Sequence, residues 1–203
     1  MEMNIRKDAI YNTIGNFVYL ATIWIISVIT ARLVDFECAG VLALGMTISN
    51  IFISIASYQL RFYYAAEVKR IYKDNQYILC RFMTIGISCI FCIIYCFVVG
   101  YNMNIIFSIF LFYFYKCFEM ISDILYGVMQ RNSKLYLCGY SMILKSVGTL
   151  IVYVMFLYIF KDLNIALIGI DLIALGVLVF YDIGVCNKFG KIQIKYSKGT
   201  DYI

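Results

Sequence analysis

Three charged side chains, Lys116, Glu119 and Asp123, lie inside the long apolar stretch of residues 105–134. A charge near the centre of a membrane helix costs about 2.5 to 3.5 kcal/mol on insertion scales, so three in one helix require protein or water around them. Spacings of three, four and seven residues place them, together with Gln130, along one stripe of a helix. We therefore expect this helix to face the interior of a helical bundle.

A charged stripe of this kind supports two kinds of chemistry, and the sequence leaves both open. Opposed charges around a water-filled cavity can bind a charged substrate or a coupling ion. Alternatively, Lys116 and Glu119 simply neutralise each other inside a packed bundle, because residues three apart are neighbours on a helix. The second interpretation leaves Asp123 without a role, which favours the cavity.

Other polar side chains lie within further apolar stretches and are candidates for the same cavity. They are Asn12, Asn16, Asn50, Lys145 and Asp171. Asp123 and Lys145 each lie about seven residues, or about 10 Å, from the same membrane surface. Their matched depth and opposite charges predict an ion pair. Lys116 and Asp171 are expected deeper, near the midplane of the membrane.

The elements that must position these residues are membrane-spanning helices. Of the 203 residues, 64% are hydrophobic and the mean hydropathy is +0.86, outside the range of soluble proteins. Six apolar stretches are long enough to cross a bilayer, and the alternation typical of a membrane barrel is missing. The expected spans are residues 9–31, 40–60, 79–100, 105–129, 138–160 and 163–186. The sequence thus predicts an all-α polytopic membrane protein, with residues 1–186 as one six-span lobe and residues 187–203 as a basic tail.

The composition argues against catalysis and against a metal site. The chain contains no histidine, the commonest metal ligand and general base. Most of its eight cysteines lie in or beside the spans, where cysteine acts as a small apolar residue and disulfides are not expected. No catalytic residue, metal, bound cofactor or nucleic-acid partner is predicted, and the chain is not expected to be an enzyme.

Basic residues outside the spans are distributed unevenly. The N-terminal segment, the second and fourth loops and the C-terminal segment hold thirteen Lys and Arg residues, whereas the intervening loops hold only Arg32 and Lys161. Cytoplasmic loops of membrane proteins carry the excess of positive charge, so both termini are expected in the cytoplasm. The four lysines of the tail are expected to contact anionic membrane lipids.

Three stretches of the chain resemble a known family. They are ARLVDFECAGVLAL at residues 31–44, YQLRFYYAAEVKRIY at residues 58–72 and YKCFEMISDILYGVMQRNSKLYLCGYSMILK at residues 115–145. Together they resemble the N-terminal half of the polysaccharide biosynthesis flippases, the O-antigen and capsule repeat-unit translocases of the MATE-like superfamily. The third stretch is the most specific, because its charged, glycine and glutamine positions fit the family pattern.

The resemblance implies a function in the bacterial cytoplasmic (inner) membrane. Such flippases pass an undecaprenyl-diphosphate-linked oligosaccharide from the cytoplasmic to the periplasmic leaflet, through a cavity between two six-helix lobes. By this likeness Lys116 and Lys145 would attract the diphosphate or an acidic sugar. Glu119, Asp123 and Asp171 would respond to protons or sodium ions, which would make H⁺ or Na⁺ the coupling ion.

The chain departs from this family in size, since members usually have twelve to fourteen spans. Six spans imply half of a two-lobe transporter, completed by a second copy or a separate lobe, or else a truncated member. Two alternatives are a cation-coupled multidrug exporter of the same superfamily and a nontransporting membrane scaffold. The scaffold would hold glycosyltransferases or a polysaccharide polymerase as partners.

Overall fold

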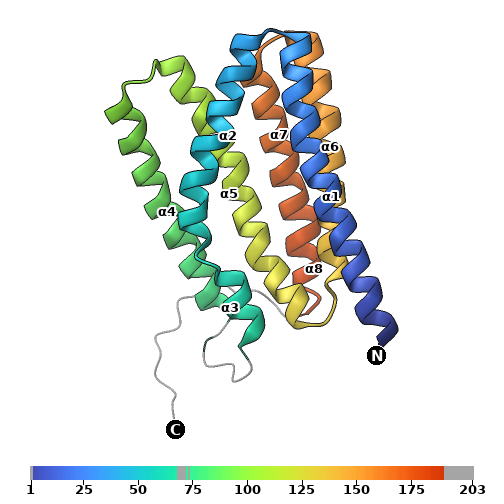
Figure 1. The fold of residues 1–203 in the computed structure, drawn as a ribbon. Helices are drawn as coiled ribbons and strands as arrows, with labels where there is room; N and C mark the ends of the chain where they lie inside the picture. Colours follow the sequence, from blue (N-terminus) through green and yellow to red (C-terminus); the bar gives the residue numbers. More distant parts are fainter. Residues whose placement is uncertain (1, 68–71, 73, 190–203) are drawn as a thin grey trace.

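The computed structural model describes residues 2–67, 72 and 74–189, and this part of the chain is helical without a strand. Its helices are α1 (Glu2–Leu33), α2 (Phe36–Ser57), α3 (Leu60–Ala66), α4 (Asp74–Val99), α5 (Met103–Arg131), α6 (Tyr136–Phe160), α7 (Leu163–Val177), the π-helix η1 (Leu178–Ile183) and α8 (Gly184–Cys186). They form six rods long and apolar enough to cross a membrane, with α2 and α3 in the second rod and α7, η1 and α8 in the sixth. The rods run side by side in Figure 1. The prediction of an all-α polytopic membrane protein is confirmed.

α2 and α4 begin before the predicted apolar spans, and aspartate side chains cap α2 and α7. The carboxylate of Asp35 accepts a hydrogen bond from the backbone N–H of Cys38 at 2.6 Å and so caps α2. Asp162 caps α7 in the same way, with two N–H groups of the first turn. α4 begins at Asp74, before the predicted start at residue 79. Residues 190–203 of the predicted tail lie outside the described residues.

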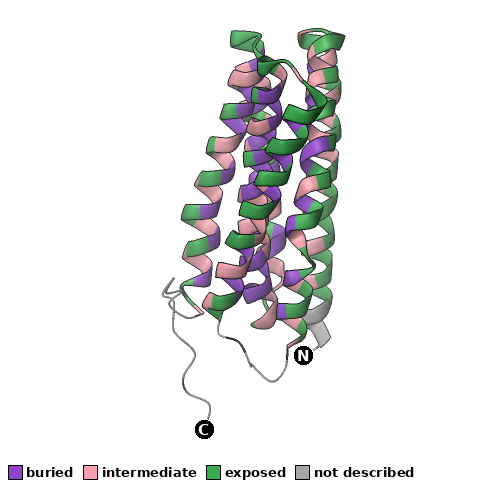
Figure 2. Ribbon diagram, turned by 90° about the vertical axis from the view of Figure 1, so that its left-hand side faces the viewer, coloured by how far each residue is buried: buried purple, intermediate pink, exposed green. Residues whose placement is uncertain are grey.

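Large apolar side chains cover the outside of the bundle. Phe17, Trp24, Phe97 and Phe180 are between 62% and 87% exposed. Figure 2 shows exposed residues along the outer faces of the helices and buried residues along the inner faces. Soluble monomers rarely expose apolar surface of this extent, whereas lipid tails solvate it well. The surface therefore agrees with a multi-pass membrane protein.

Helix α5, which carries the charged stripe, is the most enclosed of the six rods. In its most apolar window 44% of the residues are buried, compared with 17% for α4. It packs against α2, α3, α4, α6 and α7 and lies in the middle of the bundle in Figure 1. The expectation that this helix faces the interior is therefore confirmed.

Two glycines allow α1 and α6 to pack backbone against backbone. A methyl group built on Gly15 would lie 2.8 Å from the carbonyl oxygen of Gly139. A methyl group on Gly139 would collide with the backbone carbonyl of Tyr11. Glycine at such positions lets membrane helices approach closely, and the resulting van der Waals contact stabilises them. This contact fixes α1 along one wall of the bundle.

Replacing Gly139 by Ala is expected to destabilise the folded chain by about 1 to 3 kcal/mol, because two backbones would have to move apart. Thermal unfolding in a mild detergent measures this loss. Gly86→Ala is the matched control, since a methyl group there meets no atom within 4 Å and alanine favours a helix. Equal stability of the two variants would contradict the close approach of α1 and α6.

Candidate functional site

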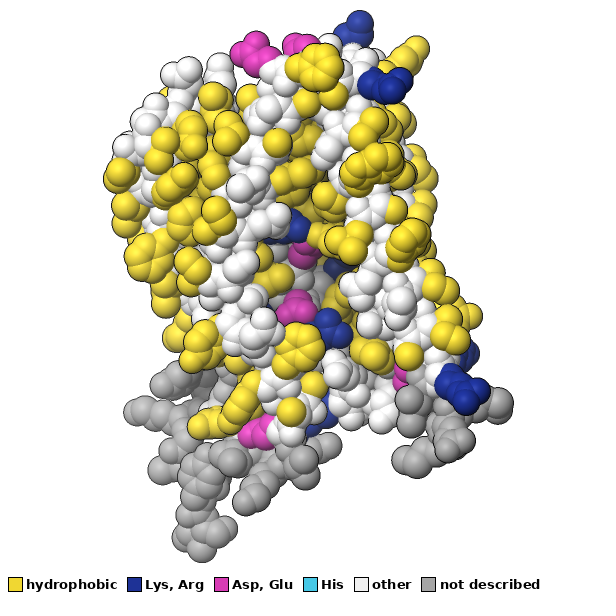
Figure 3. All heavy atoms as spheres, in the orientation of Figure 1, with side chains coloured by type: hydrophobic (Ala, Val, Ile, Leu, Met, Phe, Trp, Pro, Cys, Tyr) yellow, Lys and Arg dark blue, Asp and Glu magenta, His cyan; other side chains and the backbone are white. Residues whose placement is uncertain are grey.

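A cavity of about 340 Å³ lies between α1, α2, α5 and α6. Its lining comprises Asn16, Tyr19, Asn50, Ile53, Ser54, Lys116, Glu119, Met120, Asp123, Tyr126, Met142 and Lys145. Figure 3 shows it as a hollow in a mostly apolar face, with basic and acidic side chains inside. Six of the nine residues that the sequence singled out line this cavity; they are Asn16, Asn50, Lys116, Glu119, Asp123 and Lys145.

Lys116, Glu119 and Tyr19 form a closed triad on the cavity wall. The Nζ of Lys116 donates hydrogen bonds to the hydroxyl of Tyr19 at 2.5 Å and to Oε2 of Glu119 at 2.9 Å. The Tyr19 hydroxyl in turn donates to the same Oε2 at 2.9 Å. Lys116 is only 8% exposed, so its charge depends on Glu119 for compensation. The sequence left open whether Lys116 and Glu119 neutralise each other or line a cavity. In the structure they do both.

Asp123 is held by two arginines from neighbouring helices. Its Oδ1 lies 3.3 Å from Nη1 of Arg61 on α3, and its Oδ2 lies 3.0 Å from Nη2 of Arg81 on α4. The predicted pair of Asp123 with Lys145 is therefore wrong. Both arginines reach Asp123 because they lie on helices and not in a loop. Arg61 is on α3, which follows α2 after a short break, and Arg81 is on α4, which begins before the predicted start of its span.

Arg81 also closes the break between α2 and α3. Tyr58 and Gln59 adopt positive φ angles of 41° and 49°, which end the regular helix and leave carbonyl groups without intrahelical partners. Nη1 of Arg81 donates to the carbonyl oxygens of Ala56 and Ser57, each at 2.8 Å. The guanidinium group is completely buried. One side chain thus satisfies the helix break and the Asp123 carboxylate together.

Lys145 is paired with Asp182 rather than with Asp123. Its Nζ lies 2.7 Å from Oδ2 of Asp182 and also donates to Ser122. Ser141 donates to Oδ1 of Asp182 at 2.5 Å and shares a 2.7 Å hydrogen bond with the hydroxyl of Tyr126. Both charged groups are buried, at 3% and 0% exposure. The network therefore compensates a buried ion pair with hydrogen bonds on both sides.

The π-helix η1 explains why Asp182 faces Lys145. Asp182 follows Asp171 by eleven residues, which is about three turns of an uninterrupted α-helix, so both would share one face. A π-helix has more residues per turn than an α-helix. The turn at Leu178–Ile183 therefore rotates Asp182 away from the face of Asp171 and toward α6.

Three of the predicted site residues lie outside the cavity lining, namely Asn12, Gln130 and Asp171. Asn12 and Asp171 each have a buried side-chain oxygen without a hydrogen-bond partner in the described part of the chain. On α5, Gln130 does not line the cavity. Tyr64 of α3 packs against Gly127 of α5, between the cavity and Gln130 along the helix. The structure does not assign a common site to these three residues.

Seven residues of the networks were not among the predicted site residues; they are Tyr19, Arg61, Arg81, Ser122, Tyr126, Ser141 and Asp182. The arginines lie at the predicted ends of spans, where they resemble ordinary cytoplasmic loop residues. The tyrosines resemble apolar wall residues. Asp182 carried a usable signal, because it is an acid inside an apolar stretch.

The cysteines contribute packing to the wall behind the site. All eight are free thiols, and Cys92, Cys96 and Cys117 belong to one apolar cluster formed by α2, α4 and α5. Within the described residues, no group of three His, Cys, Asp or Glu side chains is arranged to hold a metal ion. The polar groups of the cavity lining are its paired charges, its hydroxyl groups and the amides of Asn16 and Asn50.

Comparison with protein families, with curated proteins and with solved structures finds no match for this chain. The resemblance to polysaccharide flippases thus stays a prediction from the three sequence stretches.

Proposed function

We propose that the chain translocates an undecaprenyl-diphosphate-linked oligosaccharide across the cytoplasmic membrane for the synthesis of a surface polysaccharide. The observation that carries this proposal is the charged cavity in an otherwise apolar lateral face of the bundle. Charged groups inside a membrane bundle are costly and mark pathways for polar substrates. The cationic Lys116 and Lys145 on the wall suit a substrate with anionic groups.

The opening of the cavity suits a substrate that keeps a lipid tail. α1 and α2 join at one end of the bundle and diverge toward the end that carries α3, and the hollow of Figure 3 lies between them. The lining residues Asn16 and Asn50 are exposed in this gap. A polar headgroup can enter sideways there while its apolar chain stays in the lipid.

The membrane orientation and a second lobe belong to the same proposal. The basic residues favour the end with α3 and the N-terminus as the cytoplasmic end, which labelling of introduced cysteines from outside cells would test. A second six-span lobe, from another copy or a separate protein, would close the gap between α1 and α2. Partners in polysaccharide assembly, such as a polymerase or glycosyltransferases, would supply and use the substrate.

One observation favours a second candidate function, a nontransporting scaffold for polysaccharide assembly enzymes. Each charged residue of the cavity lining has an oppositely charged partner in the described chain. Charged side chains that are already paired need no substrate to be stable. Transport and scaffolding differ in whether the cavity charges act on a lipid-linked substrate.

Reconstitution of the chain in liposomes tests the proposal with a fluorescent prenyl-diphosphate-linked oligosaccharide. We expect movement between leaflets, and we expect the double variant Lys116→Gln with Glu119→Gln to abolish it while the fold is kept, because both charges of the wall pair are removed and neither is left buried without a partner. Lys134→Gln, a change of the same type outside the cavity lining, is the control. Initial rates that rise faster than the number of chains per vesicle would indicate a two-lobe unit. Well-folded chains without any movement would favour the scaffold instead.

A further inference from the structure

The charged networks around the cavity carry one positive charge more than they carry negative charges. The cations are Arg61, Arg81, Lys116 and Lys145, against the carboxylates Glu119, Asp123 and Asp182. Two of the four cations, Lys116 and Lys145, each have a carboxylate of their own. The surplus therefore resides where two arginines share Asp123.

Of these two arginines, Arg61 is the one that Asp123 can release. Arg81 binds Asp123 at 3.0 Å and is fixed by two carbonyl groups at 2.8 Å, and it is completely buried. Arg61 makes a longer contact with Asp123, of 3.3 Å, and its side chain is 13% exposed. If Arg61 leaves, Asp123 keeps a full counter-charge.

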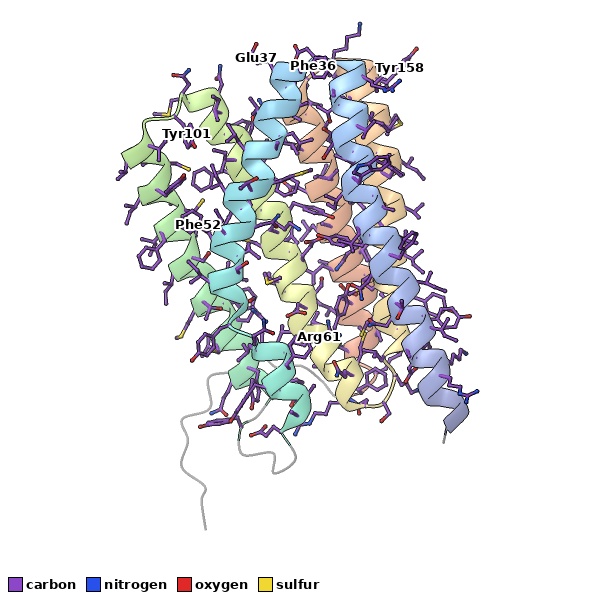
Figure 4. All side chains as sticks on the ribbon, viewed as in Figure 1. Phe36, Glu37, Phe52, Arg61, Tyr101 and Tyr158 are labelled. Carbon is purple, nitrogen blue, oxygen red and sulfur yellow. The ribbon has the colours of Figure 1, made fainter. Side chains whose placement is uncertain are left out.

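The position of Arg61 places its free charge next to the cavity. Its guanidinium lies 5.6 Å from the ring of Tyr126, and both Tyr126 and Asp123 line the cavity. Figure 4 shows Arg61 at the start of α3, beside α5. The regular helix is interrupted at Tyr58 and Gln59, between α2 and α3. Arg61 therefore lies on a short helix that is distinct from α2.

We propose that Arg61 is the anchor for a diphosphate group that enters the cavity, exchanging its contact with Asp123 for the anion. The planar guanidinium group suits this task because it binds phosphate oxygens with two parallel hydrogen bonds. The inference deepens the proposed function and rests on it, since the diphosphate is the anionic part of the proposed substrate. It transfers the anchoring role from Lys116 and Lys145, which are already neutralised, to Arg61.

Equilibrium binding to the full chain in phosphatidylcholine nanodiscs tests this proposal. The probes are inorganic pyrophosphate and geranylgeranyl diphosphate, both measured by calorimetric titration. Arg61→Gln is expected to weaken binding at least about tenfold, because a charge-assisted contact is lost. Its fold should persist, since Arg81 still compensates Asp123. Tighter binding of the prenyl compound would identify a lipid headgroup as the source of the anion, whereas equal binding would identify the free diphosphate group as sufficient.

Two further variants separate recruitment of Arg61 from a structural role. Asp123→Asn leaves the buried Arg81 without a counter-charge and therefore lowers stability. In the chains that stay folded it should tighten diphosphate binding, because it removes the carboxylate that competes for Arg61. Arg131→Gln, which removes an arginine paired with Asp74 outside the cavity lining, should leave binding unchanged. Wild-type chains that bind neither probe, or Arg61→Gln chains that bind as the wild type does, would overturn the proposal. A chain that binds diphosphate through Arg61 yet moves no lipid would keep this inference and lose the proposed function.

Discussion

Asp182→Asn is expected to lower the free energy of unfolding by about 3 to 5 kcal/mol, because it leaves the ammonium group of Lys145 buried without a counter-charge. The two side chains are 3% and 0% exposed, and their 2.7 Å contact holds α6 against η1. The asparagine has one acceptor oxygen where the carboxylate has two, so either Lys145 or Ser141 would lose its acceptor. Unfolding in mixed detergent micelles, followed by far-UV circular dichroism, measures the change.

The double variant Lys145→Met with Asp182→Leu should recover most of this stability, because apolar residues of similar volume often replace a buried ion pair without loss. Asp171→Asn is the matched control from the same rod. Its carboxylate has no ion-pair partner among the described residues, so removal of the charge should not destabilise the chain. A double variant as unstable as Asp182→Asn would show that the pair is not the origin of the effect.

Composition and span length were sufficient to predict the fold class, and the charges within residues 105–134 were sufficient to predict the enclosed position of α5. Apolar segments of about twenty residues leave few alternatives to membrane helices. Lys116, Glu119 and Asp123 were expected to face inward because exposing their charges to lipid is costly. The same cost explains why Lys145, predicted from another segment, lines the same cavity.

The partners of these charges were not predictable from depth alone. Asp123 and Lys145 were paired because they lie at the same depth in the membrane. Depth alone does not say in which direction around its helix a side chain points. The π-turn rotates Asp182 toward Lys145, and the break after Ser57 brings Arg61 to Asp123. Neither irregularity is marked by proline or glycine within it. Local propensity therefore gave no signal for the two features that decide the pairing.

Arg81→Met is expected to be the second strongly destabilising change, with a loss on the order of 3 to 5 kcal/mol. The methionine fills much of the same volume but provides no donor. The carbonyl groups of Ala56 and Ser57 would remain buried without partners, at about 1 to 3 kcal/mol for an unsatisfied group. The break between α2 and α3 should then fray, which hydrogen exchange of the backbone amides of α3 would detect as faster exchange.

Arg61→Met is the matched comparison, because it removes the other arginine from the same carboxylate. It should cost far less than Arg81→Met, since Asp123 keeps Arg81 and the helix break keeps both of its hydrogen bonds. Exposed or partly exposed ion pairs contribute about 0 to 1 kcal/mol. If the two variants were equally unstable, Arg61 would be as fixed as Arg81, and it could not exchange Asp123 for an anion in the cavity.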